Sequence, residues 1–432
     1  MQVSVRPGLL LHPPALPRNF KRPYKLYNGN SGDLSSAVTF TRSSAGFAWV
    51  NGVLTSFATN IPRIGNYENN TSYPGLILEP SGVNNIANSS MTGAVVGTPG
   101  TIPTGWRFFN GDAGVALNVV GVGTSNGLPY IDVRAVGTTT GSSALFLQFT
   151  AANEIAATSA QVWTASTYMA LIAGTETNFS EVRHVIEEQT AIGVGVASTI
   201  VNEKGNLTSS LQRRIITRTL NNVATFSISS HFALVWTSGG LAIDATYRIA
   251  LPVLEQAAFE QTAVPTSTVA VSRGTDNAII TSLSTKPWFN PVECTIFVDF
   301  QKSPRNTSAG VAIALDDTGD DYQNYLQIVA EATQGSVTSA LTTAGVQQFS
   351  LANTTTGSND RFKAALAFRA NDVALAVNGV VVGTDTSVTL PTFNRIFIGR
   401  RFDGLGLGGT MADSAIYPSR LSNARLVAMT GA

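Results

Sequence analysis

The chain has 432 residues, more than a single hydrophobic core usually serves, so we expect several domains. Charged residues make up only 12% of the chain, about half the usual share, while 39 glycines and 18 prolines place turns throughout it. A helical bundle, which solvates its surface with Lys, Glu and Arg, does not fit this composition. The sequence therefore predicts an all-β protein.

The charge balance and the cysteine content exclude several classes of function. Basic and acidic residues both number 27, so there is no broad basic field and we expect no nucleic-acid partner. A single cysteine, Cys294, excludes an internal disulfide and a cysteine-based zinc site. The three histidines, His12, His184 and His231, do not have metal-ligand spacing. Calcium, discussed below, is the one cofactor left open.

Residues 1–33 form a separate segment, which we interpret as an extended arm. Five prolines and five basic residues stand in it, and no acid precedes Asp33. Because prolines fix φ and withhold donors, the segment should pack against another surface and not on itself. A docking arm and a solvated tail are the two alternatives. The first residues form neither a signal peptide nor a spanning helix, so we expect synthesis in the cytoplasm and no membrane insertion.

Two Asn-Gly pairs mark β-hairpins, because a type I′ turn needs positive φ at both central residues. Asn51-Gly52 lies between apolar runs and predicts a small β element over residues 34–85. Asn378-Gly379 lies between runs of alternating valines and predicts a second hairpin.

Strand patterns divide the remainder into two β-sandwich jelly rolls in tandem. Short apolar runs separated by glycine and asparagine clusters predict the first jelly roll over residues 86–271. Period-two alternation begins at Ile296, Val298 and Phe300 and predicts the second over residues 272–432. Only residues 421–429 have a helical pattern, with Ser419 as the expected cap.

A series of short segments resembles the N-terminal part of bacteriophage tail proteins and other virion proteins that carry carbohydrate-binding-module-like jelly rolls. The segments follow in order at residues 38–42, 49–54, 60–63, 75–80 and 84–86. Residues 254–259, 264–266 and 271–273 are similar in sequence to the closing strand and exit loop of such a module.

The last third resembles a concanavalin A-like, laminin-G-type jelly roll. The similar segments are residues 294–298, 375–379, 396–399, 415–417 and 420–422. Together the resemblances imply a bacteriophage virion structural protein, in a tail, a fibre or a surface decoration, that attaches to host or environmental glycans. They also imply other virion proteins as partners of the arm, a homo-oligomer, and location in the virion.

Catalytic motifs are weak, and we expect no enzyme. Residues 123–127 match a nucleophile elbow, but the strand and the helix that this motif needs are not predicted around it. A glycosidase would need paired carboxylates at alternate positions of one strand. Glu187 and Glu188 are adjacent, so they should point to opposite faces, and we interpret this stretch as a solvated strand edge. A polysaccharide depolymerase and a decoration protein without glycan binding remain the alternatives.

One dense acidic loop has two interpretations. As a turn, its Asp and Gly residues only shape the backbone, and this interpretation carries the greater weight. As a site, its carboxylates could bind calcium beside tyrosines that stack on a sugar. The calcium candidates are Asp316, Asp317, Asp320 and Asp321, and the glycan-binding candidates are Tyr322, Tyr325 and Trp106. For Trp106 a place in a core is the alternative.

Overall fold

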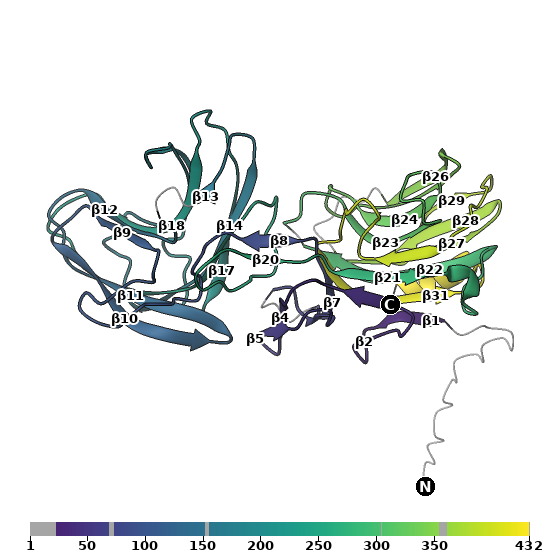
Figure 1. The fold of residues 1–432 in the computed structure, drawn as a ribbon, viewed down its shortest axis with the longest axis horizontal. Coiled ribbons are helices and arrows are strands. Elements are labelled where there is room, and N and C mark those ends of the chain that lie inside the picture. Colours follow the sequence, from purple (N-terminus) through teal and green to yellow (C-terminus); the bar gives the residue numbers. More distant parts are fainter. Residues whose placement is uncertain (1–22, 69–72, 152–154, 304, 354–360, 432) are drawn as a thin grey trace, which may run out of the picture.

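The protein folds into two β-sandwiches that lie side by side along its long axis (Figure 1). The computed structural model describes residues 23–68, 73–151, 155–303, 305–353 and 361–431. Within these ranges there is one α-helix, α1 (Asn423–Thr430), and one 3-10 turn, η1 (Leu283–Thr285). The predicted all-β sandwich fold is confirmed. No helix in the described part of the chain has the length and apolar character needed to cross a membrane.

The middle sandwich is built from two antiparallel sheets. The five-stranded sheet has the order β10-β11-β19-β14-β17, with bounds β10 Val115–Ser125, β11 Leu128–Thr138, β14 Val162–Gly174, β17 Gln212–Thr219 and β19 Ala242–Glu255. The facing sheet has the order β16-β15-β18-β12-β9 with β13 paired to β18, and bounds β9 Arg107–Asn110, β12 Ser143–Gln148, β13 Ile155–Ala156, β15 Glu181–Gln189, β16 Gly195–Asn202 and β18 Ser227–Trp236.

The core of the middle sandwich follows from alternation along these strands. Ile131 and Val133 of β11 and Leu234 of β18 are fully buried between the sheets. Trp163 and Trp236 fill the same core, so they are not surface platforms. The Trp236 indole also donates a hydrogen bond to Asp112 at 3.1 Å, which satisfies its only polar group.

The C-terminal sandwich has a nine-stranded and a seven-stranded sheet. The first has the order β2-β1-β31-β22-β27-β28-β29, with β7 paired to β31 and to β6, and bounds β1 Tyr24–Asn28, β2 Asp33–Leu34, β6 Ile64–Gly65, β7 Gly75–Leu78, β22 Glu293–Lys302, β27 Arg361–Arg369, β28 Asp372–Val377, β29 Val380–Asp385 and β31 Gly409–Tyr417. The second has the order β26-β25-β24-β23-β30-β21-β3, with bounds β3 Thr39–Thr41, β21 Asn277–Thr281, β23 Gly310–Asp316, β24 Tyr325–Ala330, β25 Val337–Thr343, β26 Val346–Asn353 and β30 Arg395–Ile398.

The N-terminal segment belongs to this second sandwich, which differs from the prediction. We expected an arm over 1–33 and a separate β element over 34–85. Instead β1 and β7 both pair with β31, and β3 pairs with β21. Leu26 and Tyr27 are buried in the C-terminal core. The reason is that β31 and β21 would otherwise present unpaired edges, and distant strands complete them. The remainder of the predicted arm, residues 1–22, lies outside the described residues.

Both predicted hairpins are present. Asn51 and Gly52 have φ of 50° and 77° between β4 (Gly46–Val50) and β5 (Val53–Phe57). Asn378 and Gly379 have φ of 46° and 84° between β28 and β29. The helix also forms, but its cap is Ser422, whose hydroxyl accepts from the Arg425 backbone, and not Ser419.

The chain enters and leaves the middle sandwich at one place. β8 (Gly82–Asn84) leads in, β20 (Val271–Arg273) leads out, and the two pair antiparallel with Asn84 opposite Val271. Figure 1 shows these two strands side by side between the sandwiches. The middle sandwich is therefore an insertion between β7 and β21, which both belong to the C-terminal one.

A buried ionic network fixes this joint. Asp276 contacts Arg42 at 3.1 Å and also Arg63, and Glu79 contacts Arg63 at 2.7 Å and Arg273 at 3.5 Å. All five side chains are almost completely buried. Burial alone would raise the pKa of Glu79, but Arg273 and Arg63 lower it to about 2. The charges on both sides of the insertion point thus hold one another in place.

Candidate functional site

The candidate site lies on the outer face of the six-stranded sheet of the middle sandwich. Residues opposite one another on antiparallel neighbours share a face. Gln148 on β12 lies opposite Arg107 on β9 on one side and opposite His231 on β18 on the other. His231 in turn lies opposite Val185 on β15. One row of side chains thus crosses four strands on the side away from the core.

The adjacent row carries aromatic side chains. Phe109 on β9 is opposite Phe146 on β12. The Phe109 ring is 41% exposed, and the Arg107 guanidinium lies 4.5 Å from its centre. Phe146 contacts the His231 ring edge-to-face at 5.5 Å. The two rows together present exposed aromatic surface beside buried polar groups.

These rows enclose a pocket of about 160 Å³, lined by Arg107, Phe109, Phe146, Gln148, Glu187, Gln189, Gly193 and His231. The amide nitrogen of Gln189 donates to Glu187 at 2.9 Å and to Ser229 at 3.3 Å. The amide oxygen of Gln189 is buried and meets no hydrogen-bond donor among the described residues. Since an unpaired buried acceptor costs stability, the pocket contains a group that a ligand hydroxyl or N–H would satisfy.

His231 is a neutral member of the site. Burial lowers its pKa to about 4, and the nearby Arg183 contributes in the same direction. The neutral ring has one nitrogen that donates and one that accepts a hydrogen bond. At neutral pH the site therefore has uncharged polar groups from His231, Gln148 and Gln189.

Chemically, the pocket carries groups that suit the binding of a polar ligand. Aromatic rings, amides and a neutral imidazole suit a flat, hydroxyl-rich molecule such as a sugar ring. Glycoside hydrolysis needs two carboxyl groups, and Glu187 is the single carboxylate among the described lining residues. Glu188 is fully buried and paired with Arg218, as its opposite orientation requires. Our interpretation of Glu188 as a solvated edge residue is therefore wrong.

The acidic loop, considered above as a calcium site, is held by ion pairs and hydrogen bonds within the protein. Asp316 is buried and accepts two hydrogen bonds from Arg395, at 2.9 and 2.6 Å. Asp320 contacts the same guanidinium at 2.5 Å. In the ranges that the structure covers, no three His, Cys, Asp or Glu side chains gather as metal ligands. Asp316 and Asp320 share the guanidinium of Arg395, a partner that the sequence pattern did not show.

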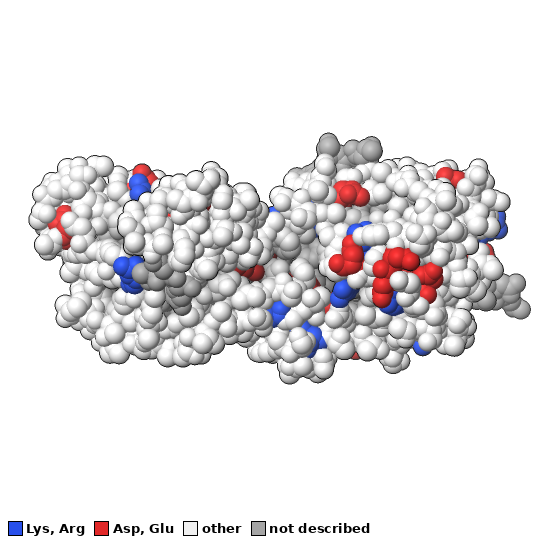
Figure 2. All heavy atoms as spheres, turned by 45° about the horizontal axis from the view of Figure 1, so that its top comes forward, with Lys and Arg blue, Asp and Glu red and all other residues white. Residues whose placement is uncertain are grey.

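The other two aspartates shape the turn. Asp317 accepts from the Gly319 backbone at 2.9 Å, and Asp321 accepts from the Gln323 backbone at 2.8 Å. These contacts are the local side-chain-to-backbone bonds of turn-forming residues. Figure 2 shows acidic side chains gathered beside basic ones on one face of the C-terminal sandwich.

The predicted glycan-binding aromatics are separated by the fold. Tyr322 is 48% exposed and contacts Tyr325 edge-to-face at 5.5 Å. The Tyr322 hydroxyl already donates to Asp403 at 2.6 Å. Trp106 is only 6% exposed, packs on Phe149 at 4.8 Å, and donates to the Asn88 carbonyl. Trp106 is thus a core residue of the middle sandwich, because its large ring fills the space between the sheets.

Sequence reasoning missed the residues of the pocket. The signal available was modest: two short runs, 107–109 and 146–148, place aromatic and polar side chains at alternate positions. Neither run shows that the two strands are neighbours.

No protein-family model matches the chain, and no curated protein matches it. Among solved structures, the chain is similar to the CBM40 of Ruminococcus gnavus IT-sialidase bound to α2,3-sialyllactose. The two are 17% identical, with 35% of this chain and 91% of that chain covered and a TM-score of 0.30. Leech intramolecular trans-sialidase is 19% identical over 33% of this chain and 24% of that chain, with a TM-score of 0.28.

The α-L-arabinofuranosidase MgGH51 is 16% identical over 50% of this chain and 31% of that chain, with a TM-score of 0.30. This chain therefore spans about a quarter of the leech enzyme and about a third of the arabinofuranosidase. At this identity and these TM-scores, the likenesses transfer neither a ligand nor an activity.

Proposed function

We propose that the protein is a non-catalytic glycan-binding protein that holds a sugar residue on the outer face of its middle sandwich. The observation that supports this most directly is the pairing of exposed Phe109 with the buried, unpaired acceptor of Gln189 in one pocket. An aromatic face and a convergent polar group are what a sugar ring requires.

We further propose that the protein is a structural component of a bacteriophage virion and attaches the particle to host or environmental glycans. This part rests on the sequence resemblance of residues 38–86. In this proposal the N-terminal residues contact other virion proteins, and several copies assemble as a homo-oligomer. A depolymerase, the enzymatic alternative, has less support because one carboxylate lines the pocket.

The glycan-binding proposal is tested with an array of bacterial polysaccharides. The full-length protein should bind at least one of them, and Phe109→Ala should weaken that binding about ten-fold through loss of stacking. Phe108→Ala is the matched control, since Phe108 is 36% exposed on the same strand but points to the other face. Equal binding by wild type and Phe109→Ala would contradict the site.

The virion proposal needs a separate test. Gold-labelled antibody against the protein should mark one structure on intact particles in electron micrographs. Absence of label from particles that are made in cells expressing the protein would exclude a virion role.

A further inference from the structure

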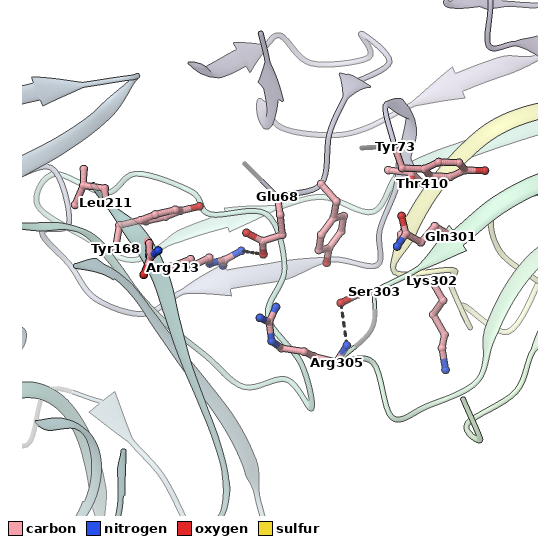
Figure 3. A pocket seen from close by; sticks show the side chains of 13 residues that line it. Glu68, Tyr73, Tyr168, Leu211, Arg213, Gln301, Lys302, Ser303, Arg305 and Thr410 are labelled. Atoms are coloured by element: carbon pink, nitrogen blue, oxygen red, sulfur yellow. Dashed lines mark hydrogen bonds and ion pairs between the residues drawn. The ribbon is translucent and has the colours of Figure 1, made fainter. Parts of the chain in front are cut away.

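A second pocket, of about 390 Å³, lies where the two sandwiches meet (Figure 3). Three parts of the chain form its walls. The middle sandwich contributes Tyr168, Leu211, Gln212 and Arg213; the N-terminal segment contributes Tyr67, Glu68 and Tyr73; and the C-terminal sandwich contributes Gln301, Lys302, Ser303, Arg305, Gly409 and Thr410. A ligand in this pocket would therefore contact both sandwiches at once.

The charged side chains around the pocket already have partners within its wall. Arg213 contacts Glu68 at 2.8 Å, and Figure 3 shows this pair facing the pocket. Arg305 contacts Glu260 at 3.0 Å. The Lys302 ammonium donates to the carbonyls of Ser308 and Glu331, and its side chain extends away from Glu68.

Because Arg213 and Arg305 have carboxylate partners and the Lys302 ammonium is held by carbonyls, the wall mainly offers hydrogen bonds. A charged ligand that reached the Arg213–Glu68 pair would have to displace one partner and leave the other charge unpaired, which is costly. An uncharged ligand avoids that cost. The pairing therefore favours a neutral molecule.

Three buried polar atoms beside the pocket have no hydrogen-bond partner among the described residues. They are the Tyr168 hydroxyl, Nε of Arg213 and the second carboxylate oxygen of Glu260. Arg213 and Glu260 are both at least nine-tenths buried. One is a donor and the other an acceptor, so a molecule carrying hydroxyl groups, which both donate and accept, can serve both kinds of atom, directly or through water.

Aromatic surface is also available. The Tyr67 hydroxyl donates to the Glu260 backbone carbonyl at 2.9 Å, which fixes that tyrosine in the wall. Tyr168 packs against Trp49 of the β4–β5 hairpin at 5.8 Å and is only 2% exposed, so the partly exposed Tyr67 carries the accessible aromatic surface. Rings held in this way lose little conformational entropy when a sugar packs on them.

We propose that this inter-sandwich pocket is a second binding site, for an uncharged pyranose residue of a glycan chain. The site is independent of the pocket around Phe109. Its ligand contacts both sandwiches and stabilises their relative orientation.

The test uses the full-length protein carrying Phe109→Ala, so that the sheet-face pocket is disabled. The probes are the methyl glycosides of glucose, galactose, mannose, rhamnose and N-acetylglucosamine, with glucuronate and inorganic phosphate as charged comparisons, followed by saturation-transfer NMR and calorimetry. At least one methyl glycoside should bind. Adding Gln212→Trp, which places a large side chain at the pocket, should weaken that binding at least ten-fold. Gln347→Trp is the matched control, an exposed glutamine on β26 of the C-terminal sandwich.

A second measurement does not depend on the tryptophan variants. The bound glycoside should slow amide hydrogen exchange at residues 211–213 in the Phe109→Ala protein. The proposal is overturned if no methyl glycoside binds this protein, if Gln212→Trp and Gln347→Trp bind alike, or if only glucuronate or phosphate binds. These outcomes leave the sheet-face proposal intact, since that one is decided by wild type against Phe109→Ala.

Discussion

The two sandwiches use their outer faces in opposite ways. In the C-terminal sandwich, α1 covers the outer face of the nine-stranded sheet, where small side chains such as Ala365, Ala367 and Ala374 make room for it. In the middle sandwich, the corresponding face carries Phe109 and Arg107 and a pocket. A sheet face that is built to be covered has small apolar residues, whereas one built to bind has large aromatic and polar ones.

The sandwiches also differ in how complete they are. The strands of the middle sandwich, β9 to β19, all come from one continuous stretch of chain. The C-terminal sandwich takes β1, β3 and β7 from residues that precede that stretch. The C-terminal sandwich is therefore built from two separate parts of the chain, whereas the middle sandwich is built from one. Of the two, only the middle sandwich should fold by itself as a continuous fragment.

The largest expected effect comes from separating the two units. Residues 86–266 should fold alone, whereas residues 272–432 should not, because β31 and β21 each lose the N-terminal strands on one edge and the core loses Leu26 and Tyr27. This reverses the independence that the sequence suggested for 272–432. Circular dichroism with urea unfolding measures it. A chain in which a short linker joins residue 84 to residue 271 should restore a cooperative transition, and a cooperative 272–432 fragment would refute the comparison.

Breaking the joint should have the next largest effect. Asp276→Ala leaves Arg42 with an unpaired buried charge and Arg63 with Glu79 as its remaining carboxylate partner, and we expect a loss of about 3–5 kcal/mol in the free energy of unfolding. Asp244→Ala is the control, because its pair with Arg134 is exposed to solvent and should contribute less than about 1 kcal/mol. Urea midpoints of the full chain measure both, and similar losses in the two variants would show that the network is unimportant.

Acid should destabilise the middle sandwich selectively. Burial lowers the pKa of His184 to about 3 and that of His231 to about 4, below the ordinary 6.5. The unfolded chain therefore binds protons in this range that the folded chain does not, and the free energy of unfolding falls as the pH falls below 6.5. For His231 the loss by pH 4 is about 3 kcal/mol.

The pH test compares wild type with His231→Gln. Glu255 acts in the opposite direction, since burial raises its pKa to about 7 and its contribution is lost as the pH rises. The contribution of Glu255 is the same in both proteins, so it cancels in the difference between their free energies of unfolding. This difference should shrink steadily from pH 7 to pH 4. A difference that does not change with pH would show that His231 is not buried in its neutral form. Residues 271–432 contain no histidine, so the transition of the C-terminal sandwich lacks this dependence.

The acidic loop offers a smaller effect that separates its two interpretations. Asp316→Asn weakens the two-point contact with Arg395 and should cost about 1–3 kcal/mol. Asp320→Asn, at a side chain that is 64% exposed, should change stability by less than about 0.5 kcal/mol. Calcium and a chelator should leave the melting temperature of wild type unchanged. If calcium raised the melting temperature of wild type, and if each substitution removed that rise, the calcium interpretation would be supported.

The smallest expected effect compares the Asn-Gly turns at Asn51-Gly52 and Asn378-Gly379. A Cβ at Gly52 meets no atom within 4 Å, so Gly52→Ala should cost only the strain of positive φ, about 1 kcal/mol. A Cβ at Gly379 lies 3.1 Å from the Gly431 Cα after the helix, so Gly379→Ala should cost more. Thermal melting measures the stability loss of each variant. A larger loss for Gly52→Ala than for Gly379→Ala would mean that the end of the helix moves aside at little energetic cost.

The features that the sequence predicted well are local. Asn51-Gly52 and Asn378-Gly379 specify their turns through backbone φ alone, and the alternation of Ile296, Val298 and Phe300 specifies which face of a strand is buried. These properties depend on residues that are close in the chain. They need no knowledge of which strand lies beside which.

The site could not be predicted for the opposite reason. Phe109, Phe146, His231 and Gln189 come from four strands, and their proximity depends on pairing between strands that lie tens of residues apart in the chain. The motifs that resemble phage virion proteins contain Arg42, Arg63 and Glu79, which form the buried joint. That resemblance therefore concerns how the sandwiches are connected more than what they bind.

The side-by-side passage of β8 and β20 has a mechanical consequence. A pull on a ligand held by the middle sandwich reaches the C-terminal sandwich through both strands, so the tension is divided between two covalent chains. Both chains are loaded in the same direction, away from the C-terminal sandwich, and the hydrogen bonds between them are not sheared apart. The load then passes to the ionic network around Asp276, where Arg63 and Arg273 belong to opposite ends of the insertion. An anchor of this design resists extraction even though its two connecting strands are only three residues long.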